Sequence, residues 1–125
     1  MSVTEPTADA LPQLEQLLLD PTRLTIVSLV SATNWCEFAF VRANAQLSDS
    51  ALSKQLTTLG GAGLVEIRKG YVGRRPRTWV RATPAGRERL RTHLAGLQQI
   101  ADRAQQAAAG LPDDDTDPGT GTSAS

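Results

Sequence analysis

Two short segments of alternating apolar and polar residues, joined by a loop of glycine, proline and arginine, interrupt a chain that otherwise has the patterns of helices. The segments are LVEIRK (64–69) and RTWVRA (77–82), and the loop is GYVGRRP (70–76). Alternation with a period of two is typical of a β-strand, and glycine and proline between two such segments favour a hairpin. The sequence therefore predicts a two-stranded hairpin within a helical chain.

Helix start and stop signals surround this hairpin. Asp20 precedes Pro21 and Thr83 precedes Pro84, so in both places a polar cap comes before proline at the first helical position. Ser48 is a further polar cap, and three glycines between 60 and 63 end the helix that follows it. The predicted helices span 11–19, 20–32, 34–46, 48–60 and 83–110.

Positive charge is concentrated in the middle of the chain, although the whole chain has 13 basic and 13 acidic residues and is formally neutral. Residues 1–41 carry a net charge of −4, residues 42–92 carry +8 and residues 93–125 carry −4. Segregation of this kind favours a polyanionic partner for the middle of the chain. A solvated basic face without a partner is the alternative that charge alone leaves open.

The helix that follows Ser48 separates its polar and apolar residues onto opposite faces. At about 100° per residue, the leucines at 52, 56 and 59 form one apolar stripe directed toward the core. The opposite stripe contains Ser50, Ser53, Lys54 and Thr57. Hydroxyl and ammonium groups on one face suit contacts with phosphates and base edges in a major groove, and an ordinary solvated face is the alternative.

The order of helices, turn, helix, hairpin and long helix is the winged arrangement, and three segments carry a resemblance to a known family. LDPTRLTIVSLV, LSDSALSKQLTTLGGAGLVEIRK and TWVRATPAGRERL together cover roughly residues 19–92. They resemble winged helix-turn-helix transcription regulators of the MarR and ArsR type. The resemblance implies a mainly helical α+β fold, with a recognition helix that continues into a two-stranded wing and a long C-terminal dimerisation helix.

The predicted organisation has three parts. A flexible N-terminus covers 1–10, and the winged helix-turn-helix domain with its terminal dimerisation helices covers 11–110. Residues 111–125 are mostly Asp, Pro, Gly, Ser and Thr and have almost nothing to bury, so the sequence predicts a disordered acidic tail.

The hairpin has the composition of a DNA-binding wing. Gly70 and Gly73 suit a tight turn, and Arg74 and Arg75 are expected at its tip, where arginine can enter a minor groove or clamp phosphates. Arg77 is expected on the stem, together with Arg68 and Lys69. A solubilising edge hairpin is the alternative. The predicted DNA-binding residues are Ser48, Ser50, Ser53, Lys54, Thr57, Arg74, Arg75 and Arg77.

The long helix carries the seam of a two-stranded coil. Apolar residues recur at intervals of four and three from Leu90 to Ala108. The alternative use of this seam is to cover the helix predicted at 11–19, and both can hold if the first and last helices of two chains pack together. The predicted interface of a homodimer consists of Leu14, Leu18, Leu90, Leu94, Leu97 and Ala101.

The other reactive residues do not form a catalytic or metal-binding set. One cysteine, Cys36, and one histidine, His93, cannot supply a structural zinc site. Cys36 is predicted as a small buried hydrophobe with redox sensing as the alternative, and His93 is predicted at the surface or an interface. The chain has no Ser/His/Asp, Cys/His or paired-carboxylate constellation and no phosphate-binding glycine loop before a helix. The sequence therefore predicts no enzyme, no cofactor and no metal.

The aromatic residues and the apolar runs bear on effectors and on localisation. Trp35, Phe38 and Phe40 are predicted in the core, with the lining of an effector pocket between the helices as the alternative. No apolar run approaches the roughly 18 residues of a membrane span. The N-terminus lacks the basic and apolar regions of a secretory signal. These features predict a cytoplasmic protein without a membrane partner.

The sequence thus predicts a homodimeric transcription regulator, in the role of a repressor, that binds double-stranded DNA at a (pseudo)palindromic promoter site. A small-molecule effector is an optional further partner. The alternative is a winged-helix protein-interaction module whose basic hairpin binds an acidic partner protein.

Overall fold

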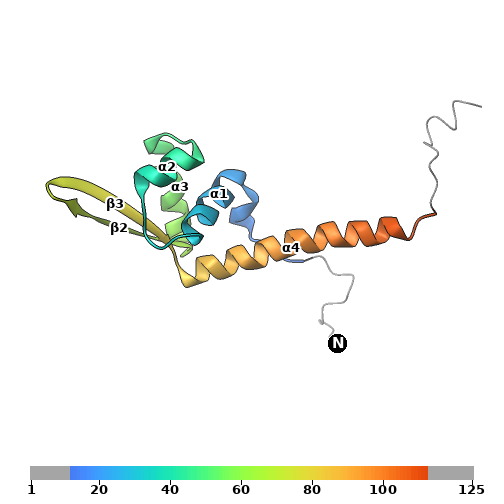
Figure 1. Ribbon diagram of the computed structural model, residues 1–125. Helices are drawn as coiled ribbons and strands as arrows, with labels where there is room; N and C mark the ends of the chain where they lie inside the picture. Colours follow the sequence, from blue (N-terminus) through green and yellow to red (C-terminus); the bar gives the residue numbers. More distant parts are fainter. Residues whose placement is uncertain (1–11, 113–125) are drawn as a thin grey trace, which may run out of the picture.

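The computed structural model describes residues 12–112. The predicted flexible N-terminus and all but the first two residues of the predicted tail lie outside this range. The described residues form a mainly helical α+β fold with one small sheet (Figure 1). In chain order its elements are a 3-10 helix η1 (Gln16–Leu19), α1 (Pro21–Ser31), β1 (Cys36–Glu37), α2 (Phe38–Ala45), α3 (Asp49–Gly61), β2 (Val65–Val72), β3 (Arg75–Ala82) and α4 (Pro84–Ala109).

The predicted caps start three of the four α-helices. The Asp20 carboxylate accepts a hydrogen bond from the backbone N–H of Arg23 at 3.0 Å, before α1. Ser48 Oγ accepts one from the residue 51 N–H at 3.1 Å before α3, and Thr83 Oγ1 accepts one from the Gly86 N–H at 2.9 Å before α4. Each cap satisfies a backbone donor that the first turn leaves unpaired, and the three predicted helix starts are confirmed.

The hairpin is longer and its turn is tighter than the sequence indicated. The antiparallel ladder of β2 and β3 continues outward to the pairs Tyr71 with Pro76 and Val72 with Arg75. Gly73 has a φ of 64°, in the left-handed region that glycine adopts without strain. The predicted loop over 70–76 was therefore too long, because most of its residues extend the two strands.

The third strand corrects a second boundary. Residues 34–46 were predicted as one helix, but α2 begins only at Phe38. Cys36 and Glu37 instead pair with Val80 and Trp79 of β3, which makes β3 the central strand of the sheet. This pairing joins residues more than 40 positions apart, so no local sequence pattern indicates it.

The N-terminal segment also differs from its prediction. Residues 11–19 were expected as a helix, but the described part contains only the one-turn η1 after a stretch without regular secondary structure. That stretch lies across α4 at Gly96, where a β-carbon would come within 2.6 Å of the Leu14 side chain. Because the two segments approach so closely, tertiary contact with α4 sets the conformation of residues 12–15.

The core lies between α1, α3, the sheet and the first half of α4. Its buried apolar residues are Leu18, Ile26, Val27, Val30, Cys36, Val41, Leu52, Leu56, Leu59, Leu64, Val65, Val80, Ala82 and Leu90. Cys36 is therefore a buried hydrophobe, as predicted. Phe40, predicted in the core, is instead 45% exposed on α2.

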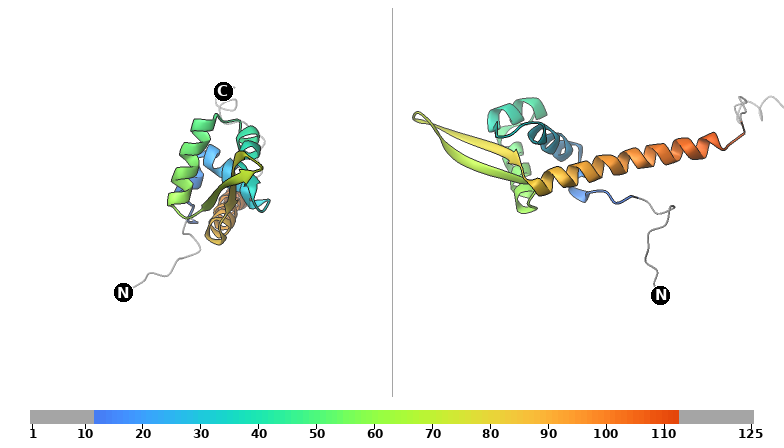
Figure 2. Two further views of the ribbon diagram at one scale, coloured as in Figure 1. Left: turned by 90° about the vertical axis from the view of Figure 1, so that its left-hand side faces the viewer. Right: turned by 60° about the horizontal axis from the view of Figure 1, so that its bottom comes forward.

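Two parts of the molecule leave this core in opposite directions. The β2–β3 hairpin projects on one side, and the far half of α4 projects on the other (Figures 1 and 2). Within residues 12–112, no helix has the length and apolar character needed to cross a membrane.

Candidate nucleic-acid interface

The polar face predicted on the recognition helix is present on α3. Ser50, Ser53, Lys54 and Thr57 are all exposed, while the leucines of the opposite stripe are buried in the core. Thr57 Oγ1 donates to the Ser53 carbonyl at 3.0 Å, so this hydroxyl keeps its acceptor lone pairs for a ligand. The Ser48 hydroxyl caps the helix, which ties one of its lone pairs to the backbone.

The polar face of α3 and the wing border one open groove of about 520 Å³. Ser53 and Thr57 of α3 stand on one side, and Lys69 and Thr78 of the wing stand on the other. Glu37 of β1, together with Phe38 and Ala39 at the start of α2, also lines the groove. Two predicted DNA-binding segments that are separate in sequence are thus brought together around a single concave surface.

The basic residues of the hairpin fall into two groups. Arg74 and Arg75 are exposed at the turn, and neither they nor Lys69 have an ion pair with another residue of the described range. Arg77, in contrast, pairs through Nε with Glu37 Oε1 at 3.3 Å. The wing tip therefore presents its positive charge uncompensated, whereas the charge of Arg77 on the stem is partly balanced within the chain.

The other two stem arginines contact an aromatic ring. The guanidinium carbons of Arg68 and Arg81 lie 4.5 Å and 4.6 Å from the centroid of the Trp35 ring. Arg81 also pairs with Glu66, Nε to Oε1, at 2.8 Å. Sequence reasoning missed this cluster. A signal was present for part of it, because a turn centred on residues 73 and 74 places Arg81 directly opposite Glu66, but no local pattern indicated the contacts with Trp35.

A second feature that the sequence analysis missed is an ion pair at the start of α3. Arg42 of α2 contacts Asp49 of α3, Nη1 to Oδ1, at 2.5 Å. The pair joins the two helices of the helix-turn-helix unit at the edge of the groove. The two residues lie on different helices, so no helical spacing marked them in the sequence.

The three aromatic residues proposed as an effector pocket do not come together. Phe38 lines the groove beside α3, Phe40 points to solvent, and Trp35 lines a separate hollow of about 330 Å³ with Arg68 and Trp79. Among the described residues no group of three or more His, Cys, Asp or Glu side chains is arranged to hold a metal ion.

The residues predicted at a dimer interface separate into a buried and an exposed set. Leu18 and Leu90 are buried in the core of the single chain, and their part in a dimer interface stays a prediction. Leu14 is half-buried against α4. Leu94 and Leu97 are 46% and 38% exposed, and Ala101 is exposed as well. Ile100, which the prediction omitted, is 41% exposed on the same helix.

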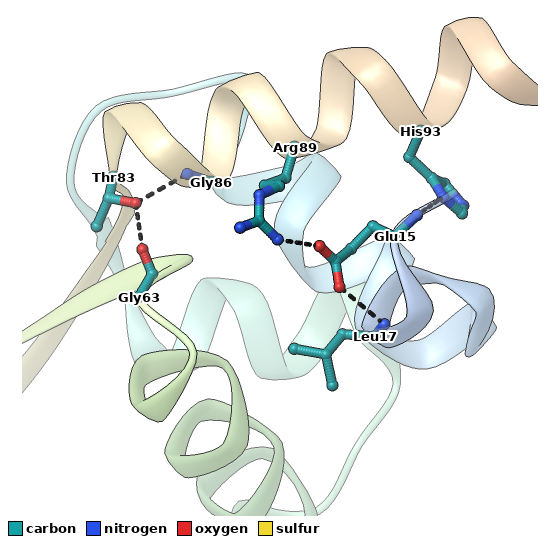
Figure 3. Close-up of polar contacts among 7 residues, drawn as sticks. All are labelled: Glu15, Leu17, Gly63, Thr83, Gly86, Arg89 and His93. Carbon is teal, nitrogen blue, oxygen red and sulfur yellow. Dashed lines mark hydrogen bonds and ion pairs between the residues drawn. The ribbon is translucent and has the colours of Figure 1, made fainter. Parts of the chain in front are cut away.

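His93, predicted at the surface or an interface, is 1% exposed. Its Nδ1 accepts a hydrogen bond from the backbone N–H of Glu15 at 3.1 Å (Figure 3). The side chain of Glu15 contacts Arg89 on the preceding turn of α4 and caps η1 by accepting from the Leu17 N–H. These contacts hold the N-terminal segment on the first half of α4.

The same contacts set the ionisation of Glu15. Burial alone would raise its pKa, but the hydrogen bond from the Leu17 backbone, the contact with Arg89 and the proximity of His93 together lower it below the ordinary value of 4.5. Glu15 is therefore anionic in the neutral range and is paired with a cation of α4.

Comparison with known proteins gives one family and several related structures. The family described as a winged helix DNA-binding domain matches residues 22–101. An uncharacterised protein of Methanocaldococcus jannaschii is 27% identical over 79 residues, which are 63% of this chain and 86% of that protein. The structure of a transcriptional regulator homologue from Pyrococcus horikoshii OT3 is 27% identical with a TM-score of 0.67, over 72% of this chain and 89% of that one. A MarR-family regulator from Silicibacter pomeroyi is 26% identical with a TM-score of 0.55, over 78% of this chain and 63% of that one.

Proposed function

The chain belongs to the winged helix DNA-binding domain family and is a DNA-binding transcriptional regulator, and from this premise we propose that it represses transcription as a homodimer bound to a two-fold-related duplex site. The observation that carries the proposal is the groove that α3 and the wing share. A family of this kind acts by occupying DNA, not by catalysis.

Within this proposal, α3 and the wing have different roles on the duplex. The hydroxyls and the ammonium group of Ser53, Lys54 and Thr57 enter a major groove, where base edges are distinguishable. Arg74 and Arg75 follow the phosphates or enter the adjacent minor groove. Arg77 remains part of the proposed site, with a smaller contribution because Glu37 already balances part of its charge.

The proposed dimer uses the far half of α4. The stripe of Gly86, Leu90 and His93 is buried against the rest of the chain. At the same spacing of three and four residues it continues as Leu97 and Ile100, and then as alanines 104 and 107, all of which are exposed. This face of α4 packs against the core in the near half of the helix and is exposed in the far half. The partner that best covers the exposed part is a second α4. Leu94 and Ala101 flank this stripe.

A dimer of this kind explains why the site on DNA should have two halves. Two-fold symmetry presents two α3 helices, which read half-sites about one helical turn, roughly 34–36 Å, apart. The protein then occupies a promoter and blocks its use. As a regulator of chromosomal genes it works where the chromosome lies, which we propose to be the cytoplasm. The proposal extends to a small-molecule effector, for which the hollow of Trp35, Arg68 and Trp79 supplies an aromatic and cationic lining.

The decisive experiment has two steps. Binding selection from random duplexes should yield a two-fold-related site, to which two chains bind per duplex. Fluorescence anisotropy should then show that log affinity falls linearly with log salt concentration, as expected when phosphate contacts release counterions. A reporter gene behind the selected site should be expressed less when the protein is present.

The outcomes also separate the alternative function. A protein-interaction module with a basic hairpin would show no preference among duplexes and would bind an acidic partner protein instead. Selection of a site without two-fold symmetry, bound by a single chain, would contradict the dimer while leaving DNA binding in place. Increased reporter expression would contradict repression alone.

A further inference from the structure

Trp35 connects both strands of the wing to the body of the protein. It lies between α1 and β1, at the base of the hairpin. Arg68, on β2, and Arg81, on β3, both place their guanidinium groups over its ring at about 4.5 Å. Cation–π contacts of this kind are strongest on tryptophan. A single ring therefore contacts the outgoing and the returning strand together.

The wing needs such a contact because its outer part lacks a third strand. β1 pairs with β3 only at Trp79 and Val80. From Thr78 outward, β2 and β3 pair only with each other among the described strands. A two-stranded ribbon is marginally stable by itself. Contacts at its base therefore set the direction in which the tip, with Arg74 and Arg75, points.

Trp35 can serve as a fixed point because its own segment is anchored to α4. Arg87 of α4 donates through Nη1 to the Ser31 carbonyl at 2.5 Å and through Nη2 to the Thr33 carbonyl at 3.0 Å. The Thr33 hydroxyl in turn lies 2.6 Å from Cys36 Sγ. These bonds span the segment from the end of α1 to the start of β1, so the backbone around Trp35 is held at both ends.

The two arginines that stack on Trp35 lie outside the groove. Ile67 and Lys69 line the groove beside α3. Arg68 lies between them on β2, and because side chains alternate along a strand it points to the opposite face. Arg81 is opposite Glu66 in the ladder and shares that outer face. Both guanidinium groups thus lie on the far side of the sheet from α3, against Trp35.

We infer that Trp35 is a positioning residue for DNA binding, which acts through Arg68 and Arg81. It sets the direction of the wing relative to α3, and it keeps these two arginines off the duplex. The basic residues whose position depends on Trp35 are then Arg74 and Arg75 at the tip of the wing. The inference rests on the proposed function, since it states how the wing reaches the duplex.

A double-mutant cycle tests this inference on the full-length protein with the selected duplex. Trp35→Ala should weaken binding roughly tenfold, on the scale of one or two lost phosphate contacts. In the background Arg74→Ala/Arg75→Ala the same substitution should weaken binding less than about twofold. A tip without arginines makes no phosphate contacts that a change in its direction could break. Trp35→Phe, which keeps an aromatic face, should restore part of the loss. Phe40→Ala removes an exposed aromatic residue from α2 and should have the same small effect in both backgrounds.

The salt dependence gives a second readout that a purely structural role would not produce. Arg75→Gln should lower the slope of log affinity against log salt by about 0.9, the value for one phosphate contact. In the background Arg74→Ala/Arg75→Ala, Arg68→Gln should leave the remaining slope unchanged, because the tip no longer makes phosphate contacts that a change of direction could break. A slope lowered further by Arg68→Gln in that background would show that Arg68 touches the duplex and would overturn the inference.

Direct observation of the wing separates this inference from the proposed function. Backbone ¹⁵N relaxation of the free protein should show a lower order parameter at Gly73 in Trp35→Ala than in the wild type, with the core amides unchanged. An unchanged order parameter, or an equal loss of affinity in both backgrounds of the cycle, would overturn the role of Trp35. Failure of the wild type to bind any duplex would overturn the proposed function, and the relaxation measurement would still decide whether Trp35 directs the wing.

Discussion

The wing and the far half of α4 both extend from the same core, in opposite directions (Figure 1). The side chains on their surfaces differ in chemistry. The wing ends in Arg74 and Arg75, which have no ion pair among the described residues. The far half of α4 carries Leu97 and Ile100, exposed by 38% and 41%, followed by alanines. Uncompensated positive charge favours a polyanion, whereas an apolar helical stripe favours another helix.

The two projections also differ in what holds their shape. The backbone hydrogen bonds of α4 form within the helix, so its far half does not depend on pairing with another strand or segment for these bonds. A two-stranded ribbon depends on contacts at its base, which Trp35 and the Cys36–Val80 pairing supply. The far half of α4 thus carries a continuous exposed apolar stripe, whereas the wing carries charge whose position depends on the contacts at its base.

The largest effect is expected from a charge placed on α4. Leu97→Asp puts an unpaired carboxylate into the proposed interface, which should weaken the dimer by about 3 kcal/mol or more, or more than a hundredfold. Sedimentation velocity should show a wild-type dimer and a monomeric variant at micromolar concentration. Affinity for a two-fold-related duplex should fall with the dimer.

Gln99→Asp is the matched control, because it adds the same charge on the opposite side of the same exposed helical segment. It should leave the dimer intact. If both variants remained dimeric, the apolar stripe of α4 would not be the dimer interface.

The next largest effect should show that α3, and not the wing, reads the sequence. Ser53→Leu and Thr57→Leu should reduce the preference for the selected site over random duplex by about 1–3 kcal/mol per base contact disturbed. Competition titration measures this preference. Thr25→Leu is the control, because Thr25 on α1 makes the same bond to a carbonyl four residues earlier as Thr57 does. Unchanged preference in both α3 variants would assign the readout to another element.

A smaller and less selective effect is expected from the wing tip. Arg74→Ala combined with Arg75→Ala should weaken binding to specific and random duplexes alike, by roughly tenfold, and should lower the salt slope by nearly two. Anisotropy titrations at several salt concentrations measure both quantities. Arg91→Ala, which removes an exposed positive charge from α4, should leave the slope unchanged. A wing variant with the full wild-type slope would exclude the tip from the phosphate contacts.

The smallest effect concerns the near half of α4, where the N-terminal segment is held. The pKa of Glu15 is lowered in the folded protein, so its ionised form stabilises the fold above about pH 4.5, and this contribution is lost as the pH falls through the lowered pKa. Glu15→Gln should therefore lower the melting temperature by a few degrees at pH 7. The difference from the wild type should shrink as the pH falls below about 4.5, because the protonated Glu15 also lacks the charge.

Glu88→Gln provides the comparison for Glu15, since Glu88 forms an exposed ion pair with Arg91 on the same helix. Exposed pairs contribute little, so its melting temperature should follow that of the wild type across the pH range. A difference between Glu15→Gln and the wild type that stayed constant down to pH 3 would exclude ionisation of Glu15 as its cause.

The sequence by itself determined the features that depend on neighbours within a few residues. Asp20, Ser48 and Thr83 cap the helices they were expected to cap, because a cap bonds to a backbone group two or three positions away. The opposite faces of α3 follow from helical spacing alone. The hairpin followed from alternation and a glycine turn, and the order of these elements was enough to indicate the winged fold.

Only the tertiary structure decided the features that depend on residues far apart in the chain. The pairing of Cys36 with Val80 moved the start of α2, and His93, which was expected at the surface or an interface, is buried where it accepts a hydrogen bond from the Glu15 backbone. The stacking of Arg68 on Trp35 distinguished a base whose arginine contacts an aromatic ring from a tip whose two arginines have no ion pair among the described residues. The physical reason is that burial and pairing depend on which distant segments the fold brings together, whereas caps, turns and helix faces depend on the local backbone.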